Sequence, residues 1–258
     1  GLCLVRDIVA DPAELEGVST TPPRIVRENT VDGLLVNYAF GTPPMVRDLL
    51  DRCRIPAIWF NRKRTENCVY PNDFGAAFEG TQSLIAQGHR RIAYVKVDSC
   101  IAWTKDREPH YSFVDREAGY RQAMNDAGLM PQSLDISRIP SKPADRPGHL
   151  MRSFVEILGR ADLPTALLCE KGGRVMLFAA ATLGLRVPDD LSVMTFDSQA
   201  SADHEVAVDR LLIRHRAMGR LAVEEICELI KHSSAPRKPV TIPFEFHRVG
   251  TVGPPRRS

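Results

Sequence analysis

The sequence predicts an α/β protein in which parallel strands are covered by helices on both faces. Short apolar runs alternate with amphipathic segments of helical length along most of the chain, and this alternation is typical of right-handed crossover units. The clearest unit ends in GHRRIAYVKVD, residues 88–98, whose apolar run is too short for a helix and too continuous for a strand with one wet face. With 258 residues the chain is also long enough for two lobes.

Composition and charge narrow the class of protein. The chain is 43% hydrophobic and 26% charged, and its 34 basic and 32 acidic residues give a net charge of +2. Because the basic residues are scattered, they predict no dedicated polyanion-binding surface. The six cysteines lie far apart without a C-x-x-C pair, so we expect reduced thiols in a cytosolic protein, with no disulfide framework, metal site or cofactor. No apolar run approaches the roughly 18 residues of a membrane span.

The first half of the chain is expected to contain four strands, two helices and, at residues 24–29, the tail of a further helix. The strands cover residues 2–5, 31–36, 55–60 and 92–97, and the helices cover 45–52 and 74–87. Asn72 or Asp73 can act as the N-cap of the second helix. Gly88 then ends it, because a left-handed residue is least costly there. The predicted inward face of this helix consists of Phe74, Ala77, Phe78, Leu84 and Ile85.

The second half continues the alternation. The expected helices cover residues 116–127, 150–158, 175–183 and 216–230, and the expected strands cover 165–169, 191–196 and 240–246. Residues 137–147 are rich in Pro, Arg and Ser and are expected to form an exposed connection. In parallel sheets of this kind, ligands bind beyond the carboxyl ends of the strands.

Polar side chains follow the apolar strands at several of these ends. They are Asn37, Asn61, Asp98, Lys171 and Asp197. Each one alone is better explained as a turn former or a helix cap. Five together predict a polar rim that could bind a ligand.

Arg116 breaks a local rule. A helix from about Arg116 to Ala127 would place this cation in the first turn after the cap Asp115, where it opposes the helix dipole at a cost of about 0.3–1 kcal/mol. An unfavourable local choice near a predicted ligand site suggests a function. The alternative to a functional role is that Arg116 forms a surface ion pair with Asp115 or Glu117.

Five ordered motifs carry a resemblance to a known family. They are GHRRIAYV, DREAGYRQAMNDAG, PTALLC, GLRVPDDLSVMTFD and MGRLAVEEICELI. Together, from about Val31 to Arg248, they resemble the effector-binding region of bacterial transcription regulators of the lactose-repressor and galactose-repressor family. The resemblance implies a periplasmic-binding-protein-like fold of type I, with two doubly wound parallel-sheet lobes joined by three crossover segments. It also implies that a small effector, usually a sugar or nucleobase, is held between the lobes.

On the family pattern, the three crossings fall near Val97–Asp98, Asp209–Ile213 and Pro239–Ile242. They assign residues 1–97 and 214–238 to an N-terminal lobe, and residues 98–213 and 239–258 to a C-terminal lobe. The family's helix-turn-helix and its first strand and helix are not recognised before Leu2. We therefore expect a DNA-binding segment outside this chain.

Family roles transfer to three positions. Arg116 matches the arginine of an R-x-x-G-Y motif, which clamps hydroxyl or carboxylate oxygens of the effector. Asp197 in VMTFDS matches the acid of a G-F-D-D motif, and Asn61 in AIWFN matches a position that is often Asp and faces the cleft. A fork of donors facing an acid and an amide can bracket a polyol, and a wrong ligand is penalised because it leaves buried polar groups unpaired.

The chain departs from the family after the strand of PTALLC. Where the family usually has Asn-Asp, this chain has Lys171 and Gly172, and the segment before the last long helix contains His215 between two arginines. If Lys171 and His215 face the cleft, they predict an anionic effector such as a sugar acid or a phosphorylated sugar. The alternative is that both are solvated loop residues.

Two tryptophans and one histidine complete the candidates. Trp103 lies in a polar loop and could stack on a sugar ring, whereas Trp59 lies within a strand and is expected to be core. His89 directly follows Gly88, the glycine that ends the helix, and a histidine at this position is favourable to the helix dipole. Because no G-x-S-x-G, phosphate loop or metal spacing is found, we expect no catalytic residue.

The sequence therefore predicts a ligand-sensing domain and not an enzyme. We expect a cytoplasmic homodimer whose small-molecule effector controls DNA binding by a segment outside this chain, without a membrane partner. The alternative is a periplasmic sugar-binding protein that feeds a transporter. A signal sequence on the full-length product would favour the alternative, and an N-terminal helix-turn-helix would exclude it.

Overall fold

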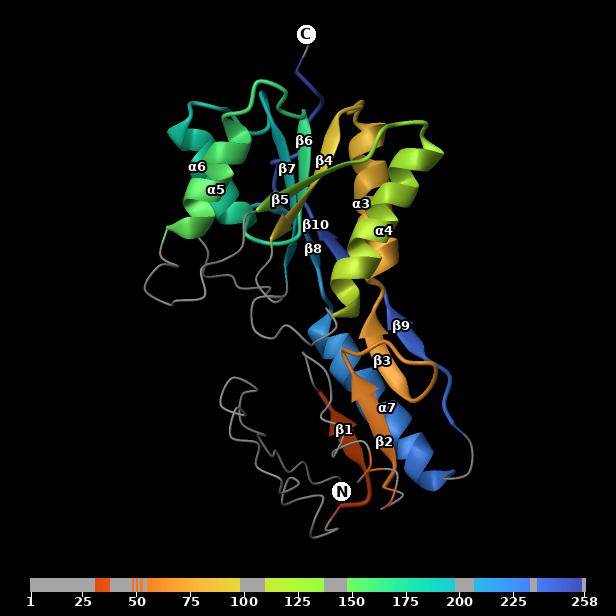
Figure 1. Cartoon of the computed structure of the whole chain (residues 1–258). Coiled ribbons are helices and arrows are strands. Elements are labelled where there is room, and N and C mark those ends of the chain that lie inside the picture. Colours follow the sequence, from red (N-terminus) through yellow and green to blue (C-terminus); the bar gives the residue numbers. More distant parts are fainter. Residues whose placement is uncertain are drawn as a thin grey trace. The chain divides into compact units, whose positions relative to one another are not determined.

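Two separate sheets organise the described part of the chain. The computed structural model describes residues 31–37, 48, 50, 52, 55–97, 110–136, 148–197, 207–232 and 236–256. These residues form two units, each with its own sheet (Figure 1). Within these ranges, no helix has both the length and the apolar character needed to cross a membrane.

The first unit contains a four-stranded sheet of order β1-β2-β3-β9. Its strands are β1 (Leu34–Val36), β2 (Ala57–Phe60), β3 (Cys68–Pro71) and β9 (Val240–Ile242). β2 runs parallel to both β1 and β3. One helix of this unit, α7 (His215–Lys231), turns Met218, Ala222, Ile226 and Leu229 inward at the spacing of an amphipathic helix.

Trp59 lies in the core of the first unit. Its side chain packs with Val36, Leu50, Ile55 and Cys68, and only 6% of the residue is exposed. This confirms the expectation that Trp59 is a core residue. Large aromatic side chains contribute much of the apolar area buried by a small core.

The second unit contains a six-stranded sheet of order β10-β8-β7-β6-β4-β5. All neighbouring strands are parallel except β10, which is antiparallel to β8. The strands are β4 (Ile92–Val97), β5 (Gln132–Ile136), β6 (Ala166–Cys169), β7 (Ser192–Asp197), β8 (Asp209–Leu212) and β10 (Glu245–His247).

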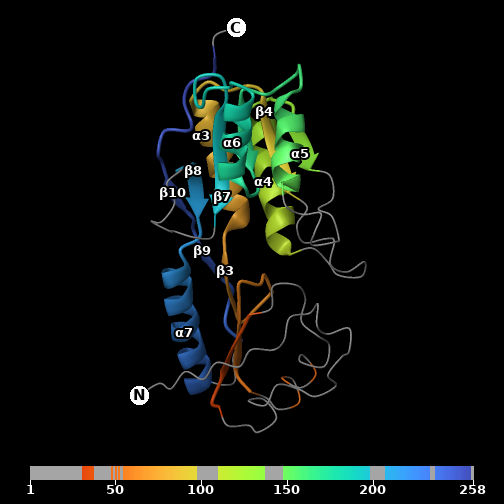
Figure 2. The same ribbon diagram turned by 90° about the vertical axis from the view of Figure 1, so that its left-hand side faces the viewer.

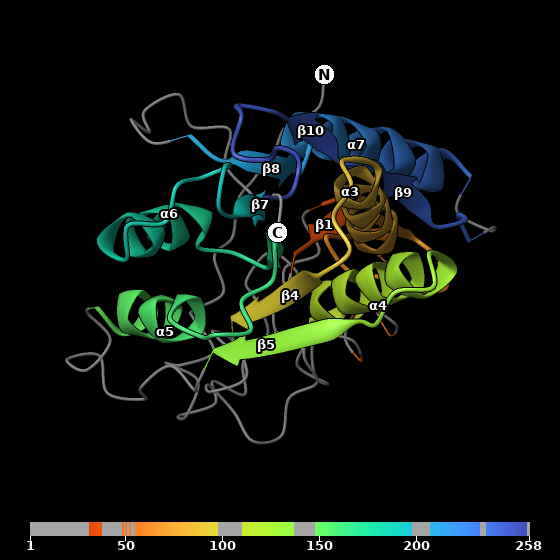
Figure 3. The same ribbon diagram turned by 90° about the horizontal axis from the view of Figure 1, so that it is seen from above.

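Helices cover both faces of this sheet (Figure 3). α3 (Asp73–Ala86) and α4 (Tyr111–Asp126) lie on one face, and α5 (His149–Leu158) and α6 (Gly173–Thr182) lie on the other, which Figure 2 turns toward the reader. In β4, Ile92 and Tyr94 belong to the core under α3 and α4, while Ala93 and Val95 belong to the core under α5 and α6. A strand buried on both faces explains the continuous apolar run.

The start and end of α3 are those that the sequence predicts. The Asn72 side chain caps the helix by accepting a hydrogen bond from the Gly75 N–H at 3.0 Å, and Gly88 follows its end with φ of +102°. The predicted inward face is wrong at Phe74, which is 40% exposed and stacks on Phe78. Ala77 and Leu84 are buried as predicted, and α3 also turns Ala76 and Gly80 inward. The face is shifted because α4 comes so close that a Cβ at Gly119 would overlap the Phe74 carbonyl oxygen.

The structure differs from the predicted division at the first boundary. The chain leaves the first unit after Tyr70, not near Val97 and Asp98, because β4 pairs with β5 and β6 of the second sheet. Two further boundaries of these units fall after His215 and after Ile242. The predicted strand at 240–246 is two strands, β9 and β10, which belong to different sheets.

Candidate functional site

A pocket of about 300 Å³ opens in the second unit, beyond the carboxyl ends of β6, β7 and β8. In doubly wound sheets this is the edge at which ligands bind. Phe113 of α4 and Phe196, Val208 and Ile213 provide apolar surface. The charged residues that line the pocket are Arg116, Glu170, Lys171, Arg174, Asp197 and Arg210.

Arg116 is held in place on two sides. Its Nε donates to Asp73 Oδ1 at 2.6 Å, and its guanidinium carbon lies 4.2 Å from the centre of the Phe196 ring. A charge-assisted hydrogen bond together with stacking on an aromatic face orients the guanidinium. Because α4 begins at Tyr111, Arg116 lies in the second turn, and the predicted conflict with the helix dipole is wrong. The ion-pair partner of Arg116 in the structure is Asp73 of α3.

Asp197 and Arg210 form the wall contributed by β7 and β8. Asp197 ends β7 with 29% of its side chain exposed, and its Oδ2 lies 3.6 Å from Arg210 Nη1. The Nε of Arg210 is buried and has no hydrogen-bond acceptor among the described residues. A buried donor without an acceptor costs about 1–3 kcal/mol. A residue that lines the pocket therefore carries a buried N–H group whose desolvation no described residue compensates.

Glu170 joins two neighbouring strands at the floor of the pocket. It follows β6 directly, is 5% exposed, and accepts hydrogen bonds from the Val97 backbone N–H at 2.9 Å and the Tyr94 hydroxyl at 3.1 Å. Burial raises the pKa of Glu170. β4 and β6 are the strands between which the strand order reverses, so Glu170 fixes the edge of the sheet where ligands bind.

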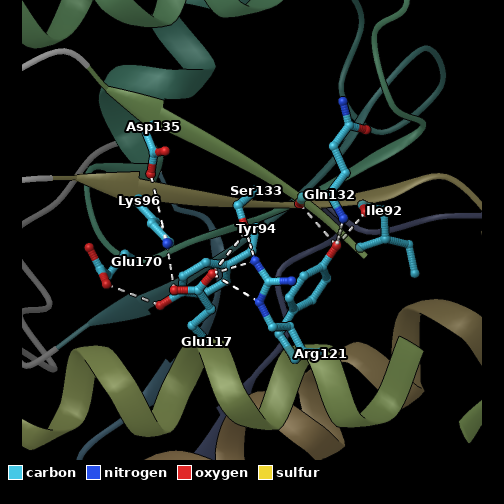
Figure 4. Close-up of polar contacts among 10 residues, drawn as sticks. Ile92, Tyr94, Lys96, Glu117, Arg121, Gln132, Ser133, Asp135 and Glu170 are labelled. Atoms are coloured by element: carbon cyan, nitrogen blue, oxygen red, sulfur yellow. Dashed lines mark hydrogen bonds and ion pairs between the residues drawn. The ribbon is translucent and has the colours of Figure 1, made fainter. Parts of the chain in front are cut away.

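A second polar network fixes α4 against β4 and β5 (Figure 4). The Lys96 ammonium lies between two carboxylates, 2.5 Å from Glu117 Oε2 and 3.9 Å from Asp135 Oδ1. Arg121 also donates to Glu117. Burial raises the pKa of Glu117, but hydrogen bonds from Lys96 and Arg121 lower it overall. Since Glu117 follows Arg116 in the chain, this network helps to hold the turn of α4 that carries Arg116.

The start of α6 forms another wall. Gly172 is its N-cap, with φ of +79°, and no side chain caps the helix. A Cβ at Gly173 would lie 2.7 Å from Thr195 Cγ2, so the two glycines let the helix start close to β7. Because residues 172–175 line the pocket, the N–H groups of the first turn, which have no acceptor within the helix, border it.

The structure brings Arg116, Lys171 and Asp197 to this one pocket. Asn61 belongs to the first unit, where it has φ of +56° and its carbonyl oxygen lies 2.9 Å from His110 Nε2. His215, the first residue of α7, is exposed and is not among the residues that line the pocket. Asp98 and Trp103 lie outside the described residues.

Comparison with known proteins places the chain in a family. A family model described as a periplasmic binding protein-like domain matches residues 81–250, well over half of the chain. The chain belongs to this family. Its periplasmic binding protein-like domain is the α/β fold with parallel sheets that the sequence predicts.

Relatives of this domain are transcription regulators. The "HTH-type transcriptional regulator GntR" of Escherichia coli strain K12 is 25% identical over 232 residues, 86% of this chain, and the chain spans only 64% of that relative's length. A LacI family transcriptional regulator from Bifidobacterium animalis subsp. lactis superposes with a TM-score of 0.73 at 20% identity, covering 98% of this chain and 88% of the other. These findings confirm the resemblance to the lactose-repressor family.

A third comparison includes a ligand. The LacI family transcriptional regulator from Enterococcus faecium was solved with bound ribose, and it superposes with a TM-score of 0.69. It is 15% identical and covers 89% of this chain and 82% of the other. At such identities the solved structures show the fold alone.

Three charged residues of the pocket were not predicted from the sequence. Glu170 directly follows a predicted strand, so the rule that selected Lys171 could have selected it as well. Arg174 follows the departure from the family pattern at Lys171 and Gly172, and lies in the first turn of α6. Arg210 has no such signal, because β8 contains two charged residues among four and does not resemble a buried strand.

Proposed function

We propose that this periplasmic binding protein-like domain is the effector-sensing part of a bacterial DNA-binding transcription regulator. Its effector is a small sugar or sugar derivative that binds in the pocket of the second unit. The observation that carries the proposal is the convergence of Arg116, from α4, and Asp197, from β7, on one pocket beyond the strand ends. The name of the Escherichia coli relative and the ribose in the Enterococcus faecium structure support it.

The pocket has the chemistry that a polyol requires. Arg116 provides donors in a fixed orientation, Asp197 provides acceptor oxygens, and Phe113 provides apolar surface for C–H groups. Each sugar hydroxyl both donates and accepts, so a ligand without the matching hydroxyls leaves these groups unpaired. Lys171 is a further proposed contact. Contacts from Asn61, Trp103 and His215 stay predictions.

Regulation requires that the effector bind one conformation more tightly than another. The difference between the two affinities limits how far the effector can shift the equilibrium. We propose that the protein acts as a cytoplasmic homodimer and that DNA is bound by a segment outside this chain. The polarity of the response, induction or corepression, then depends on which conformation binds DNA.

Isothermal titration calorimetry tests the effector site. The whole 258-residue chain is titrated with a panel of neutral sugars, sugar acids and sugar phosphates. Arg116→Gln should weaken binding of any ligand found by about tenfold or more, because a hydrogen bond to a charged group contributes about 1.5–3 kcal/mol. Arg160→Gln is the matched control, since Arg160 is exposed, pairs with Asp162 and does not line the pocket.

Two outcomes would contradict the effector site. One is the absence of binding by every member of the panel. The other is binding that Arg116→Gln and Arg160→Gln change equally.

DNA binding tests the regulatory role. The full-length product of the gene is titrated against DNA from upstream of that gene, with and without the ligand found by calorimetry. We expect the ligand to change the affinity for DNA by about 5–150-fold, the usual range of allosteric coupling, and light scattering should give the mass of a dimer. An N-terminal signal sequence and export of the protein would instead favour a binding protein of a transporter.

A further inference from the structure

We infer that the pocket selects an anionic effector, whose carboxylate or phosphate group binds between Lys171, the start of α6 and Arg210. This inference rests on the proposed function and specifies the ligand class of the same pocket. It concerns Lys171, which the sequence predicts as a ligand contact, and Arg210, which was not predicted from the sequence.

Positive charge predominates among the described residues around the pocket. Four of them with basic side chains and two with carboxylates line it. When Asp73, the partner of Arg116 outside the lining, is added to the acids, the positive charges of these described residues still exceed the negative ones. Both oxygens of Glu170 accept hydrogen bonds from β4, and Asp197 pairs with Arg210. The two carboxylates of the described lining are therefore engaged, and its formal charge is positive.

Arg174 and Arg210 bring two guanidinium groups to the lining of the pocket. Arg210 Nε is buried without an acceptor among the described residues, although Nη1 of the same side chain reaches Asp197. Arg174 is exposed and forms no ion pair with any residue that the structure describes. An anionic oxygen is the strongest acceptor available to such groups, and it forms charge-assisted hydrogen bonds with them.

The backbone at the start of α6 also favours an anion. This ten-residue helix starts at Gly173 without a side-chain cap, so its first N–H groups and the positive end of its dipole border the pocket. Helix starts of this kind bind phosphates and carboxylates in many proteins. Here the helix start shares one pocket with the buried donor of Arg210 and with the Lys171 ammonium.

Lys171 places a cation directly beyond the end of β6. It follows Glu170 in the chain and lines the pocket together with Gly172, the N-cap of α6. A positive charge at this position attracts an anionic group to the point where the strand order reverses.

Matched ligand pairs test this inference on the whole chain. Thermal-shift and calorimetric titrations compare ribose, glucose and galactose with the corresponding sugar acids and phosphate esters, and inorganic phosphate is titrated by itself. We expect inorganic phosphate to bind saturably and the charged member of a pair to bind about tenfold or more tightly than the neutral one. The carboxylate and phosphate series show which of the two anions fits. Affinity should fall as NaCl is raised, since salt screens the interaction.

Variants separate the anion contact from general effects on the fold. Lys171→Met and Arg210→Gln should each weaken binding of inorganic phosphate about tenfold, whereas Lys171→Arg should retain it. Arg160→Gln removes the same charge at a site that does not line the pocket and should leave binding unchanged. Lys171 is partly exposed, so Lys171→Met should stay folded even if Arg210→Gln does not.

The outcomes distinguish this inference from the proposed function. Tight binding of a neutral sugar with no preference for its charged counterpart would overturn the inference and leave the effector site standing. Anion binding that Lys171→Met and Arg160→Gln change equally would also overturn it. Anion binding that depends on Lys171, combined with no effect on DNA binding, would support the inference and overturn the regulatory role.

Discussion

Arg116 Nε donates to Asp73 Oδ1 across 2.6 Å and so joins α4 to the first turn of α3. Asp73 is 1% exposed, and 12% of the Arg116 side chain is exposed. The acidic residue sits where the helix dipole favours a negative charge. An arginine of the pocket is thus positioned by a buried carboxylate that does not itself line the pocket.

Asp73→Asn should lower both stability and ligand affinity. The substitution leaves the mostly buried Arg116 without its counter-charge, and breaking such a pair on one side costs about 3–5 kcal/mol. The free energy of unfolding from urea titration measures the first effect. Calorimetry with the ligand of the pocket measures the second, which arises because the guanidinium is no longer held in one orientation.

The double variant Asp73→Asn with Arg116→Met serves as the control. Without the buried cation, most of the lost stability should return, because an apolar side chain tolerates this environment. Ligand affinity should stay low, since the donor is gone. A double variant as unstable as Asp73→Asn alone would contradict the pairing.

His89 connects three segments of the chain at the end of the six-stranded sheet that lies opposite the pocket. The residue is fully buried, with Nδ1 2.8 Å from Thr165 Oγ1 and Nε2 2.8 Å from the Gly253 carbonyl oxygen. An Nε2–H must donate to that carbonyl, so a neutral imidazole satisfies both contacts, with Nδ1 accepting from the threonine hydroxyl. Burial lowers the pKa of His89 below its ordinary value of 6.5.

His89 should make stability depend on pH below neutrality. Because its pKa is lower in the folded state, the unfolded chain binds more protons as the pH falls below about 6.5. Its contribution to stability is therefore fully present above that pH and is lost as the pH falls toward the folded pKa. Urea titrations between pH 7.5 and 5 should show this slope, and His89→Gln should reduce it.

His247→Gln provides the comparison for this pH dependence. His247 is exposed on β10, and His247→Gln makes the same substitution without touching the buried contacts of His89. Equal slopes for all three proteins would show that His89 is not the group that titrates.

Glu170→Gln should be tolerated, whereas Glu170→Ala should not. The amide oxygen of Gln can still accept from the Val97 N–H, and its NH₂ can donate to the Tyr94 oxygen after the hydroxyl rotates. Alanine leaves both groups buried without a partner, at about 1–3 kcal/mol. Because burial raises the pKa of Glu170, its charge lowers stability as the pH rises through that pKa. Urea titration at pH 7.5 should therefore show Glu170→Gln at least as stable as the unaltered chain.

The elements predicted from the sequence are those with a strong local pattern. α3 and β4 combine an N-cap at Asn72, a helix end at Gly88 and a continuous apolar run. Each of these features acts within a few residues of itself, so it can be recognised without knowledge of the fold. The family motifs in addition predicted the type of fold, and they identified Arg116 and Asp197 as candidate ligand-binding residues.

The elements that were not predicted depend on distant contacts. β8 contains Asp209, which is buried because it accepts hydrogen bonds from the Val249, Gly250 and Thr251 N–H groups. Those partners lie about 40 residues away in the chain, so the local sequence of β8 reads as polar. For the same reason the sequence did not predict Asp73 as the partner of Arg116. It also did not predict the boundary after Tyr70, which depends on the pairing of β4 with β5 and β6.

Two helical glycines should respond to alanine in opposite directions. In α4, a Cβ at Gly119 would overlap the backbone oxygen of Phe74 in α3, and backbone cannot move aside as a flexible side chain can. Gly119→Ala should therefore lower the free energy of unfolding by about 1–3 kcal/mol through overpacking. In α7, a Cβ at Gly219 would meet no atom within 4 Å. Gly219→Ala should raise stability by up to about 1 kcal/mol, because alanine favours the helix.

The pair is informative because both substitutions add the same methyl group to the same kind of element. Their difference isolates the packing of α3 on α4, which also determines which face of α3 is buried and where Arg116 meets Asp73. Gly119→Ala should consequently weaken ligand binding as well as stability, whereas Gly219→Ala should leave ligand binding unchanged. Urea titration and calorimetry on the two variants measure both effects, and equal stability changes in the two would show that the helices pack less closely than the structure indicates.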